Sequence, residues 1–459
     1  MRQRTRDPEK RFTKVEKSWI TYDWANSVYA TNIMAAIFPI FYASMATDQG
    51  NKWWGIGVSI ASLVSAVLAP TLGAIADFKG YKKKLLAIFV SIGVLFTAAL
   101  AFVMHSWQLM LIGYVISRIG FSGSCVFYDS FLTDVTTHER MDRVSSWGYA
   151  MGYIGGSTIP FVISIAMLLL SNNADWAIQF SILITSVWWA VFSLPMLLNV
   201  KQVHYVETPP KDLAKNAGKN LWETLKHCLT NKGLLFFLLA YFLYIDGVDS
   251  VISLATNYGS TLGLGSTGMI LALLVTQIVA VPFSILFSRL ADKFGSIKII
   301  ITAIVVYFCI CGVGFFMGRI VEPYQIDNVI QGEAAEQARQ TASILFWVLA
   351  ALVGTVQGGI QALSRSYFGK LVPRSRSAEY FGFFDVFGRF AAVIGPLLYA
   401  MFYMLTNRAS VGILSLLILF GGGMILLIAG RKELTKTENA AREENERLAA
   451  LEAAEPAAD

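Results

Sequence analysis

The chain has 459 residues, of which 55% are hydrophobic and 15% are charged, whereas soluble domains carry about 25% charged residues. This composition excludes an ordinary water-soluble domain and indicates that lipid surrounds much of the chain. The formal net charge of +6 is carried by basic residues whose positions follow a membrane topology, so it requires no nucleic-acid partner. The four cysteines lack the spacing of a metal site or a disulfide framework, and we expect them to be free thiols.

Twelve apolar runs approach or reach the roughly 20 residues that a bilayer-crossing helix needs. They cover approximately residues 19–46, 53–76, 85–104, 107–131, 145–170, 175–198, 233–258, 267–288, 297–318, 342–364, 380–404 and 409–430. The basic segment 1–18 holds seven Lys and Arg and no short apolar core of a cleavable signal peptide, so the first run is expected to be retained. The sequence therefore predicts an all-α integral membrane protein with twelve transmembrane helices.

The basic residues predict the orientation of these helices. With the boundaries above, and with Lys298 at the edge of its span counted in the adjoining loop, 31 of the 37 Lys and Arg lie in the terminal segments and alternate loops, and four lie in the opposite loops. The positive-inside rule then places both termini in the cytoplasm. We expect a multi-pass protein of the plasma membrane, which in a bacterium is the cytoplasmic membrane. The other two basic residues, Arg118 and Arg389, fall inside predicted helices.

The longest loop on the predicted cytoplasmic side, 200–232, divides the helices six and six. It is polar and contains a Pro-Pro pair, so it is interpreted as a linker between an N-terminal half, 19–199, and a C-terminal half, 233–430. The remaining segment, 431–459, is polar and rich in Ala and Glu, and its composition favours a solvated tail over a docking element.

The two halves share sequence patterns, as duplicated transporters do. The segment Gly73–Lys83 recurs as Ser288–Lys298 at an offset of 215, and Pro160 matches Pro396 at an offset of 236. The change of offset coincides with a long external loop, Arg319–Thr341, which replaces a very short turn in the first half. The sequence therefore predicts two pseudo-symmetric six-helix halves.

A weaker match pairs Asp23-x-x-Asn26-Ser27 with Asp246-x-x-Asp249-Ser250 at an offset of 223. The predicted boundaries place Asp23 near the cytoplasm and Asp246 near the middle of the membrane. Either a boundary or the match must therefore be wrong.

Several motifs resemble those of the major facilitator superfamily. Gly73–Lys83 resembles its signature loop between the second and third helices, with a fainter copy between the eighth and ninth. Two further motifs of the superfamily resemble Arg118-x-Gly120-x-x-Gly123 in the fourth span, and Gly155-Gly156 with Pro160, which Gly395-Pro396 echoes. The resemblance implies the major facilitator fold, with Asp77 closing a cytoplasmic gate through a neighbouring helix end.

Within the superfamily, four segments are similar to the group related to the autophagy-linked vacuolar amino-acid effluxers. They are Tyr22–Ser27, Tyr128–Leu132, Gln361–Ser366 and Ser377–Gly382. The resemblance covers nearly the whole chain and implies transport of amino acids or similar small solutes, with efflux as the favoured direction. Fold-level analogy is a weaker warrant for a substrate than for a fold.

Ionisable and polar residues inside predicted helices are the candidate functional residues, because charge in a membrane is costly. Arg118 lies near mid-membrane, and Asp129, eleven residues later, points to nearly the same side of the helix; a structural ion pair with another helix is the alternative reading for Arg118. The substrate and coupling candidates are Asp23, Asn26, Arg118, Asp129, Asp246, Asp249, Asn257, Gln357, Gln361 and Arg365.

The gating candidates come from the two signature segments and from one acid–base pair. Asp385 and Arg389 have i,i+4 spacing, which favours an intrahelical pair that locks packing; a gating role for Arg389 is the alternative. The gating candidates are Gly73, Asp77, Gly80, Lys83, Asp292, Gly295, Asp385 and Arg389.

These observations predict a secondary active transporter of a small polar solute that works by alternating access. Arg118 is expected to hold a carboxylate, and Asp246 or Asp129 an ammonium, which suits a zwitterion. Either protons or sodium could be the coupling ion. A solute sensor or scaffold without flux, or a carrier of sugars, drugs or lipids, remains an alternative.

The sequence lacks the phosphate-binding and zinc-protease motifs of an ATP-driven pump or a metalloenzyme. We therefore expect no enzymatic activity, no cofactor and no metal. The expected partners are the lipid bilayer and the solute, and the protein is expected to be a monomer.

Overall fold

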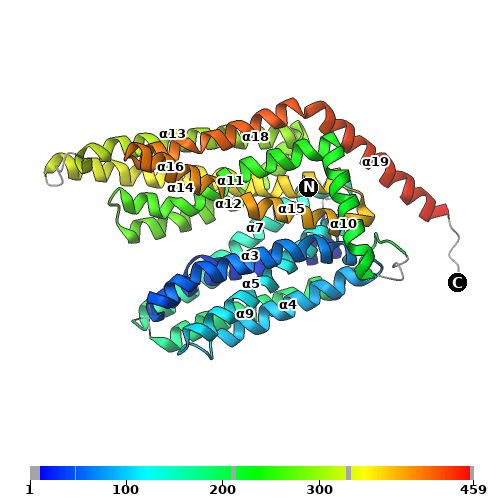
Figure 1. The fold of residues 1–459 in the computed structure, drawn as a ribbon, viewed down its shortest axis with the longest axis horizontal. Coiled ribbons are helices and arrows are strands. Elements are labelled where there is room, and N and C mark those ends of the chain that lie inside the picture. Colours follow the sequence, from blue (N-terminus) through cyan, green and yellow to red (C-terminus); the bar gives the residue numbers. More distant parts are fainter. Residues whose placement is uncertain are drawn as a thin grey trace, which may run out of the picture. The chain divides into compact units, whose positions relative to one another are not determined.

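The computed structural model describes residues 11–46, 48–172, 174–207, 213–326, 332–391 and 393–454, and these residues are almost entirely helical (Figure 1). Within them, twelve helices are long and apolar enough to cross a membrane, which confirms the predicted number of spans. The chain divides into two compact units. Unit 1 comprises residues 1–213 and 374–381, and unit 2 comprises residues 214–373 and 382–459.

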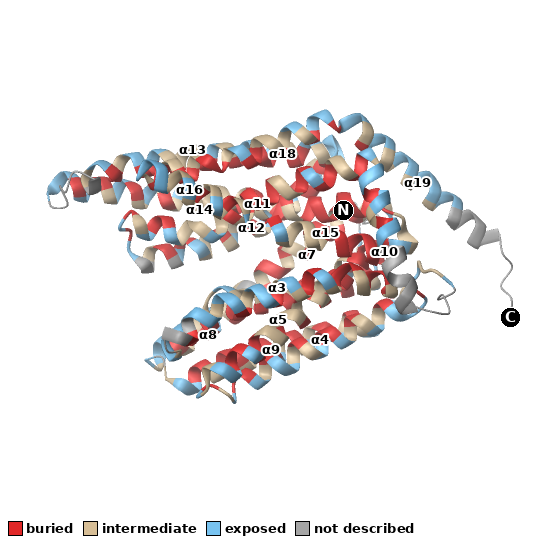
Figure 2. Ribbon diagram, in the orientation of Figure 1, coloured by how far each residue is buried: buried red, intermediate tan, exposed pale blue. Residues whose placement is uncertain are grey.

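Many large apolar side chains lie on the outer sides of the span helices, where Figure 2 shows rows of exposed residues. Leu63, Ile112, Ile278 and Ile425 are each more than half exposed. In water, so much contiguous apolar surface would drive aggregation, whereas a lipid bilayer covers it without cost. The exposed surface therefore agrees with an integral membrane protein.

Unit 1 contains the first six spans. Its helices are α1 (Lys14–Tyr29), η2 (Ala30–Ala35), α2 (Ile37–Met45), α3 (Asp48–Ala76), α4 (Tyr81–Leu100), α5 (Trp107–Ser130), α6 (Leu132–Val135), η3 (His138–Arg140), α7 (Met141–Met151), η4 (Gly152–Thr158), α8 (Ile159–Leu170) and α9 (Asp175–Asn199). The first span consists of α1, the π-helical turn η2 and α2, and the fifth contains α7, the π-helical turn η4 and α8.

The first span begins at Lys14, five residues before the predicted boundary of 19. A capping box sets this start, because the Thr13 hydroxyl accepts the Glu16 N–H and the Glu16 carboxylate accepts the Thr13 N–H. The apolar pattern could not detect this polar first turn. With this start Asp23 lies further inside the span than predicted, which reduces the conflict in the match between Asp23–Ser27 and Asp246–Ser250.

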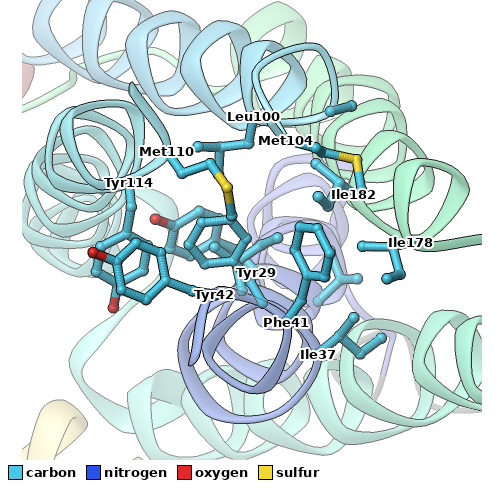
Figure 3. Close-up of a cluster of buried hydrophobic side chains, with 14 of the residues drawn as sticks. Tyr29, Ile37, Phe41, Tyr42, Leu100, Met104, Met110, Tyr114, Ile178 and Ile182 are labelled. Carbon is cyan, nitrogen blue, oxygen red and sulfur yellow. The ribbon is translucent and has the colours of Figure 1, made fainter. Parts of the chain in front are cut away.

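The core of unit 1 contains a large cluster of buried apolar side chains (Figure 3). Tyr29, Phe41 and Tyr42 of the first span meet Tyr114 of α5 and Ile182 of α9 in this cluster. The rings of Tyr42 and Tyr114 each lie within 5 Å of the Trp54 ring, centroid to centroid. Such close aromatic packing holds α5 in a fixed position beside the first span.

Unit 2 contains the remaining spans. The helices after α9 are α10 (Leu213–Thr230), α11 (Lys232–Thr261), α12 (Ser266–Phe294), α13 (Ser296–Ile326), α14 (Glu333–Leu371), η5 (Arg374–Arg376), α15 (Ser377–Ala391), α16 (Ile394–Thr406), α17 (Ala409–Ser415), α18 (Leu417–Ala429) and α19 (Arg431–Ala454). Helix α15 begins in the part of the chain assigned to unit 1 and ends in unit 2.

Two segments that the sequence presents as loop and tail contain helices. The predicted linker, 200–232, holds helix α10, in which Thr224 and Cys228 are buried while Trp222 and Leu229 are exposed. The predicted tail, 431–459, forms helix α19. The prediction that this tail is solvated is wrong for the first turns of α19. Leu434 is only 1% exposed, and the Thr437 hydroxyl donates to the Asn231 side chain at the start of α11.

The fifth and eleventh spans are interrupted at equivalent places, where glycines allow close contact with another helix. In unit 1, a Cβ added to Gly156 would lie 2.4 Å from the Ser27 Cβ of α1. In unit 2, a Cβ added to Gly395 would lie 1.9 Å from the Ser250 Oγ of α11. Ser27 and Ser250 occupy the same position in the weak sequence match, so the two units use the same packing device.

Candidate functional site

The loop between α3 and α4, residues 77–80, is here called the first signature loop. Gly80 has φ = 77°, a left-handed conformation that glycine adopts without strain. The Asp77 carboxylate accepts the backbone N–H groups of Ala378 and Glu379, each at 2.9 Å, at the start of α15. Free N–H groups at a helix start carry partial positive charge, so this contact joins a carboxylate to its preferred partner. A Cβ on Gly73 would lie 2.4 Å from the Ala378 carbonyl oxygen, so this approach requires glycine.

Asp77 is 2% exposed. Burial raises the pKa of its carboxyl to about 7, while the Lys82 ammonium and the two N–H donors act in the opposite direction and Glu379 adds to the increase. Asp77 is therefore a carboxyl group whose protonation changes near neutral pH in this arrangement.

A buried ion pair supports the first signature loop. The Lys82 ammonium lies 2.9 Å from the Asp134 carboxylate and donates to the Ser377 hydroxyl at 2.8 Å, and both charged side chains are 0% exposed. Lys82 is not among the sequence candidates. Its neighbour Lys83, which is one of them, is only half-buried. The signal that distinguishes them is Asp134, which no local pattern connects to the loop.

The corresponding loop of unit 2 differs from the first signature loop in its backbone and in the burial of its aspartate. Gly295 has φ = 90° and ψ = 142° after the end of α12, whereas Gly80 has φ = 77° and ψ = −1° before the start of α4. Asp292 is exposed, however, whereas its counterpart Asp77 is buried. The two signature segments therefore share a glycine with positive φ and differ in ψ and in the burial of the aspartate.

Arg118 lies in the middle of α5 and is half-buried. Its Nη1 donates to the Tyr114 hydroxyl at 2.8 Å, and next to it the Ser117 and Tyr29 hydroxyls lie 2.7 Å apart. In the part of the chain that the structure describes, Arg118 Nε is buried and has no hydrogen-bond partner. A guanidinium within a membrane span that keeps an unused N–H can bind an anion.

The other unit 1 candidates lie near the crossing of α1 and α5. Asp23 and Asn26 are buried in α1, and the Asn26 amide donates to the Cys125 sulfur of α5 at 3.6 Å. Asp129 is half-buried near the end of α5. Asn26 thus links the two helices, while Arg118 and Asp129 lie one after the other along α5.

Asp246, the predicted partner of an ammonium group, is already occupied. Its carboxylate accepts the N–H groups of Ile394 at 3.0 Å and Gly395 at 2.9 Å, together with the Ser250 hydroxyl at 3.2 Å. Asp246 is 0% exposed and caps the start of α16, inside the interrupted eleventh span. The broken helix thus has its exposed N–H groups satisfied by a side chain from α11, as the membrane interior demands.

Asp249, one turn after Asp246, differs from it. It is half-buried, and Ser253 and Asn257 further along α11 are exposed in unit 2. Helical spacing puts these three positions on neighbouring faces of α11, on a side that unit 2 leaves open. Within the described residues, the Asp249 carboxylate has no hydrogen-bond or ion-pair partner, and only the nearby Asp246 charge acts on it.

The remaining unit 2 candidates lie on α14 and α15. Gln357 and Gln361 are half-buried, and Arg365, one turn further, is buried. Arg389 Nη2 donates to the Asp385 carboxylate at 2.9 Å within α15, in the predicted i,i+4 arrangement. The described residues contain no group of three His, Cys, Asp or Glu side chains that could hold a metal ion.

Known proteins resemble this chain over most of its length. The family model described as "Vacuole effluxer Atg22 like" matches residues 56–440. The uncharacterised MFS-type transporter YxiO of Bacillus subtilis is 44% identical over 431 residues, which cover 91% of this chain and 95% of that protein. Autophagy-related protein 22 of Coccidioides immitis is 22% identical, with 89% of this chain and 85% of that protein covered.

Solved structures share the fold at low identity. The major facilitator superfamily transporter FucP in its outward conformation has a TM-score of 0.65 at 13% identity, with 90% of this chain and 97% of that one covered. A bacterial homologue of the iron transporter ferroportin, in an outward-facing state with soaked iron, has a TM-score of 0.61 at 15% identity, with 91% and 98% covered. At this identity, the similarity concerns the fold alone.

Proposed function

Because this chain belongs to the Atg22-like family of vacuole effluxers, within the major facilitator transporters, we propose that it is a secondary active transporter of small zwitterions such as amino acids. The observation that carries this proposal is a pair of unused charges within membrane spans. Arg118 in unit 1 keeps a buried N–H without a partner, and Asp249 in unit 2 has a carboxylate without a partner. Unsatisfied charge at such depth is costly unless a ligand or ion compensates it.

The chemistry of each group, taken by itself, suits one of the two charges of a zwitterion. A guanidinium binds a carboxylate through charge-assisted hydrogen bonds, and a free carboxylate binds an ammonium group in the same way. Asp246 is the weaker candidate for the ammonium because its oxygens accept the N–H groups of Ile394 and Gly395. We therefore assign the substrate carboxylate to Arg118, and we rank Asp249 above Asp246 as the unit 2 candidate for an ammonium group or a coupling ion.

Efflux is the favoured direction, because the family to which the chain belongs is described as an effluxer family. The distribution of basic residues supports a location in the cytoplasmic membrane with both termini inside the cell. Protons or sodium ions would supply the driving force. A major facilitator protein of this kind needs no ATP-binding motif and catalyses no covalent chemistry.

The test is counterflow in proteoliposomes preloaded with single amino acids, sugars or lipophilic drugs, with and without a pH gradient and with and without sodium. We expect counterflow with one or more amino acids. Arg118→Ala and Asp249→Asn should each reduce it at least tenfold. Asp246→Asn, the matched control, should lower thermal stability more than it changes substrate preference.

The alternatives have distinct outcomes in the same assay. A solute sensor would bind an amino acid, measured by a shift in melting temperature, and show no counterflow. A sugar or drug carrier would exchange those solutes and ignore amino acids. Unchanged amino-acid transport by both Arg118→Ala and Asp249→Asn would remove these residues from the substrate site.

A further inference from the structure

The segment that follows α9, residues 200–206, is here called the strap. Sequence analysis treats it as the start of a linker, yet it is bound along the first signature loop. The Val206 N–H donates to the Asp77 carbonyl at 2.8 Å, the Lys79 N–H donates to the Val206 carbonyl at 3.4 Å, and Phe78 and Val206 form a parallel β-bridge. Backbone pairing of this kind fixes the position of one segment against the other.

The Gln202 side chain adds hydrogen bonds between the strap and the backbone at the end of α3 and in the first signature loop. Its amide nitrogen donates to the carbonyls of Ala76 at 3.0 Å and Asp77 at 3.3 Å, and its amide oxygen accepts the Gly80 N–H at 2.9 Å. The carbonyls at the end of a helix have no partner within the helix. One side chain therefore caps the end of α3 and closes the turn that follows it.

The strap is also attached to the buried ion pair. One carboxylate oxygen of Asp134 accepts the N–H groups of Val203 at 3.0 Å and His204 at 2.8 Å, and the other is paired with Lys82. Asp134 thus ties together α6, the start of α4 and the strap. A network whose members are all satisfied is rigid, because moving one member leaves buried polar groups unpaired. The exposed Lys79–Glu207 pair at 3.8 Å adds little by comparison.

From these contacts we propose that the strap is part of the gate: it holds the first signature loop in the shape that presents the Asp77 carboxylate to the start of α15. Gln202 acts as a positioning residue, because its hydrogen bonds among the described residues go to the backbone of Ala76, Asp77 and Gly80. The strap and the loop then move as one body whenever Asp77 leaves α15. The linker between the two halves of the sequence is thereby a component of the gating machinery as well as a connection.

The experiment measures release of α15 directly, without a substrate. Glu379→Cys, 3% exposed before substitution, is introduced into a chain whose four native cysteines are replaced. The labelling rate of this cysteine by a membrane-impermeant maleimide reports how often the start of α15 becomes accessible. We expect Gln202→Ala to raise this rate roughly tenfold, as loss of hydrogen bonds of ordinary net strength implies, and Asp77→Asn to raise it at least as much.

Gln179→Ala is the matched control. The Gln179 amide donates to the Ala101 carbonyl just after the end of α4 at 3.1 Å, so it caps another span end of unit 1 away from the loop. In Gln179→Ala, the cysteine at position 379 should be labelled at the same rate as in the parent. Val206→Pro, which lacks the N–H that donates to Asp77, tests the strap independently if Gln202→Ala does not fold.

The proposal fails if Gln202→Ala and Val206→Pro both label within twofold of the parent while Asp77→Asn labels faster. It also fails if Gln179→Ala accelerates labelling as much as Gln202→Ala, because the effect would then be general destabilisation. Since the readout needs no transported solute, a negative counterflow result leaves it unaffected.

Discussion

Removal of the Lys82 ammonium is expected to destabilise unit 1 strongly. Its Nζ lies 2.9 Å from the Asp134 carboxylate, and neither side chain is exposed. At that distance and an effective dielectric constant of about 20, the Coulomb attraction is about 6 kcal/mol, of which desolvation cancels a large part. Breaking a buried pair by removing one partner costs about 3–5 kcal/mol. The Asp134 carboxylate keeps its two backbone donors, so for Lys82→Met we expect the lower end, about 3 kcal/mol.

The assay is equilibrium unfolding of the purified protein in mixed detergent micelles, with a double-mutant cycle. Lys82→Met and Asp134→Asn are measured singly and together, and the double variant should be more stable than the sum of the two losses by about 2 kcal/mol. Lys84→Met is the control, because Lys84 is exposed and should change stability by less than about 0.5 kcal/mol. A loss below about 1 kcal/mol for Lys82→Met, or full additivity in the cycle, would refute the reasoning.

Two further predictions concern the first signature loop and the crossing of α1 with η4. Burial raises the pKa of Asp77 to about 7 against α15, above the value of about 4 for a hydrated Asp, so the docked loop binds protons more strongly than a released one. The docked arrangement should therefore weaken as pH rises from about 4 through about 7. The measurement is hydrogen exchange at the start of α15, which should become faster with pH after correction for intrinsic rates. Asp77→Asn should abolish this pH dependence, and an equal pH dependence of exchange in the parent and in Asp77→Asn would contradict the prediction. Gly155→Ala would place a Cβ 1.8 Å from a carbon of the Trp24 ring, whereas Gly312→Ala meets nothing within 4 Å. Gly155→Ala should lower the free energy of unfolding by about 1–3 kcal/mol and lower the melting temperature in detergent, whereas Gly312→Ala should change neither. Equal melting temperatures for the two variants would count against the packing described.

The spans are predictable from the sequence because each is a long apolar run, which is a local property. Their starts are not, because polar turns extend them. Lys14 begins the first span through a capping box, so the hydropathy boundary falls five residues late. The amphipathic helix α10 is missed for the opposite reason: its polar composition resembles that of a linker, and only its buried Thr224 and Cys228 reveal that one face is packed.

The functional residues are predictable as types and not as individuals. Lys82, Lys83 and Lys84 follow one another, and only the position of Asp134, 52 residues from Lys82 along the chain, decides which of them is buried. The sequence favours Asp246 or Asp129 as the partner of an ammonium group, with Asp249 as a further candidate. The structure distinguishes Asp246 from Asp249, because the Ile394 and Gly395 N–H groups at the start of α16 donate to the Asp246 carboxylate.

The membership of residues 374–381 in unit 1 affects any attempt to separate the halves of this protein. A fragment that stops in the linker would lack the Ala378 and Glu379 N–H groups and the Ser377 hydroxyl, and so would leave Asp77 without its two donors and Lys82 without one of its acceptors. Co-expressed fragments would restore these partners only when the second piece supplies the start of α15. The first six spans thus form a bundle that the start of the eleventh span completes.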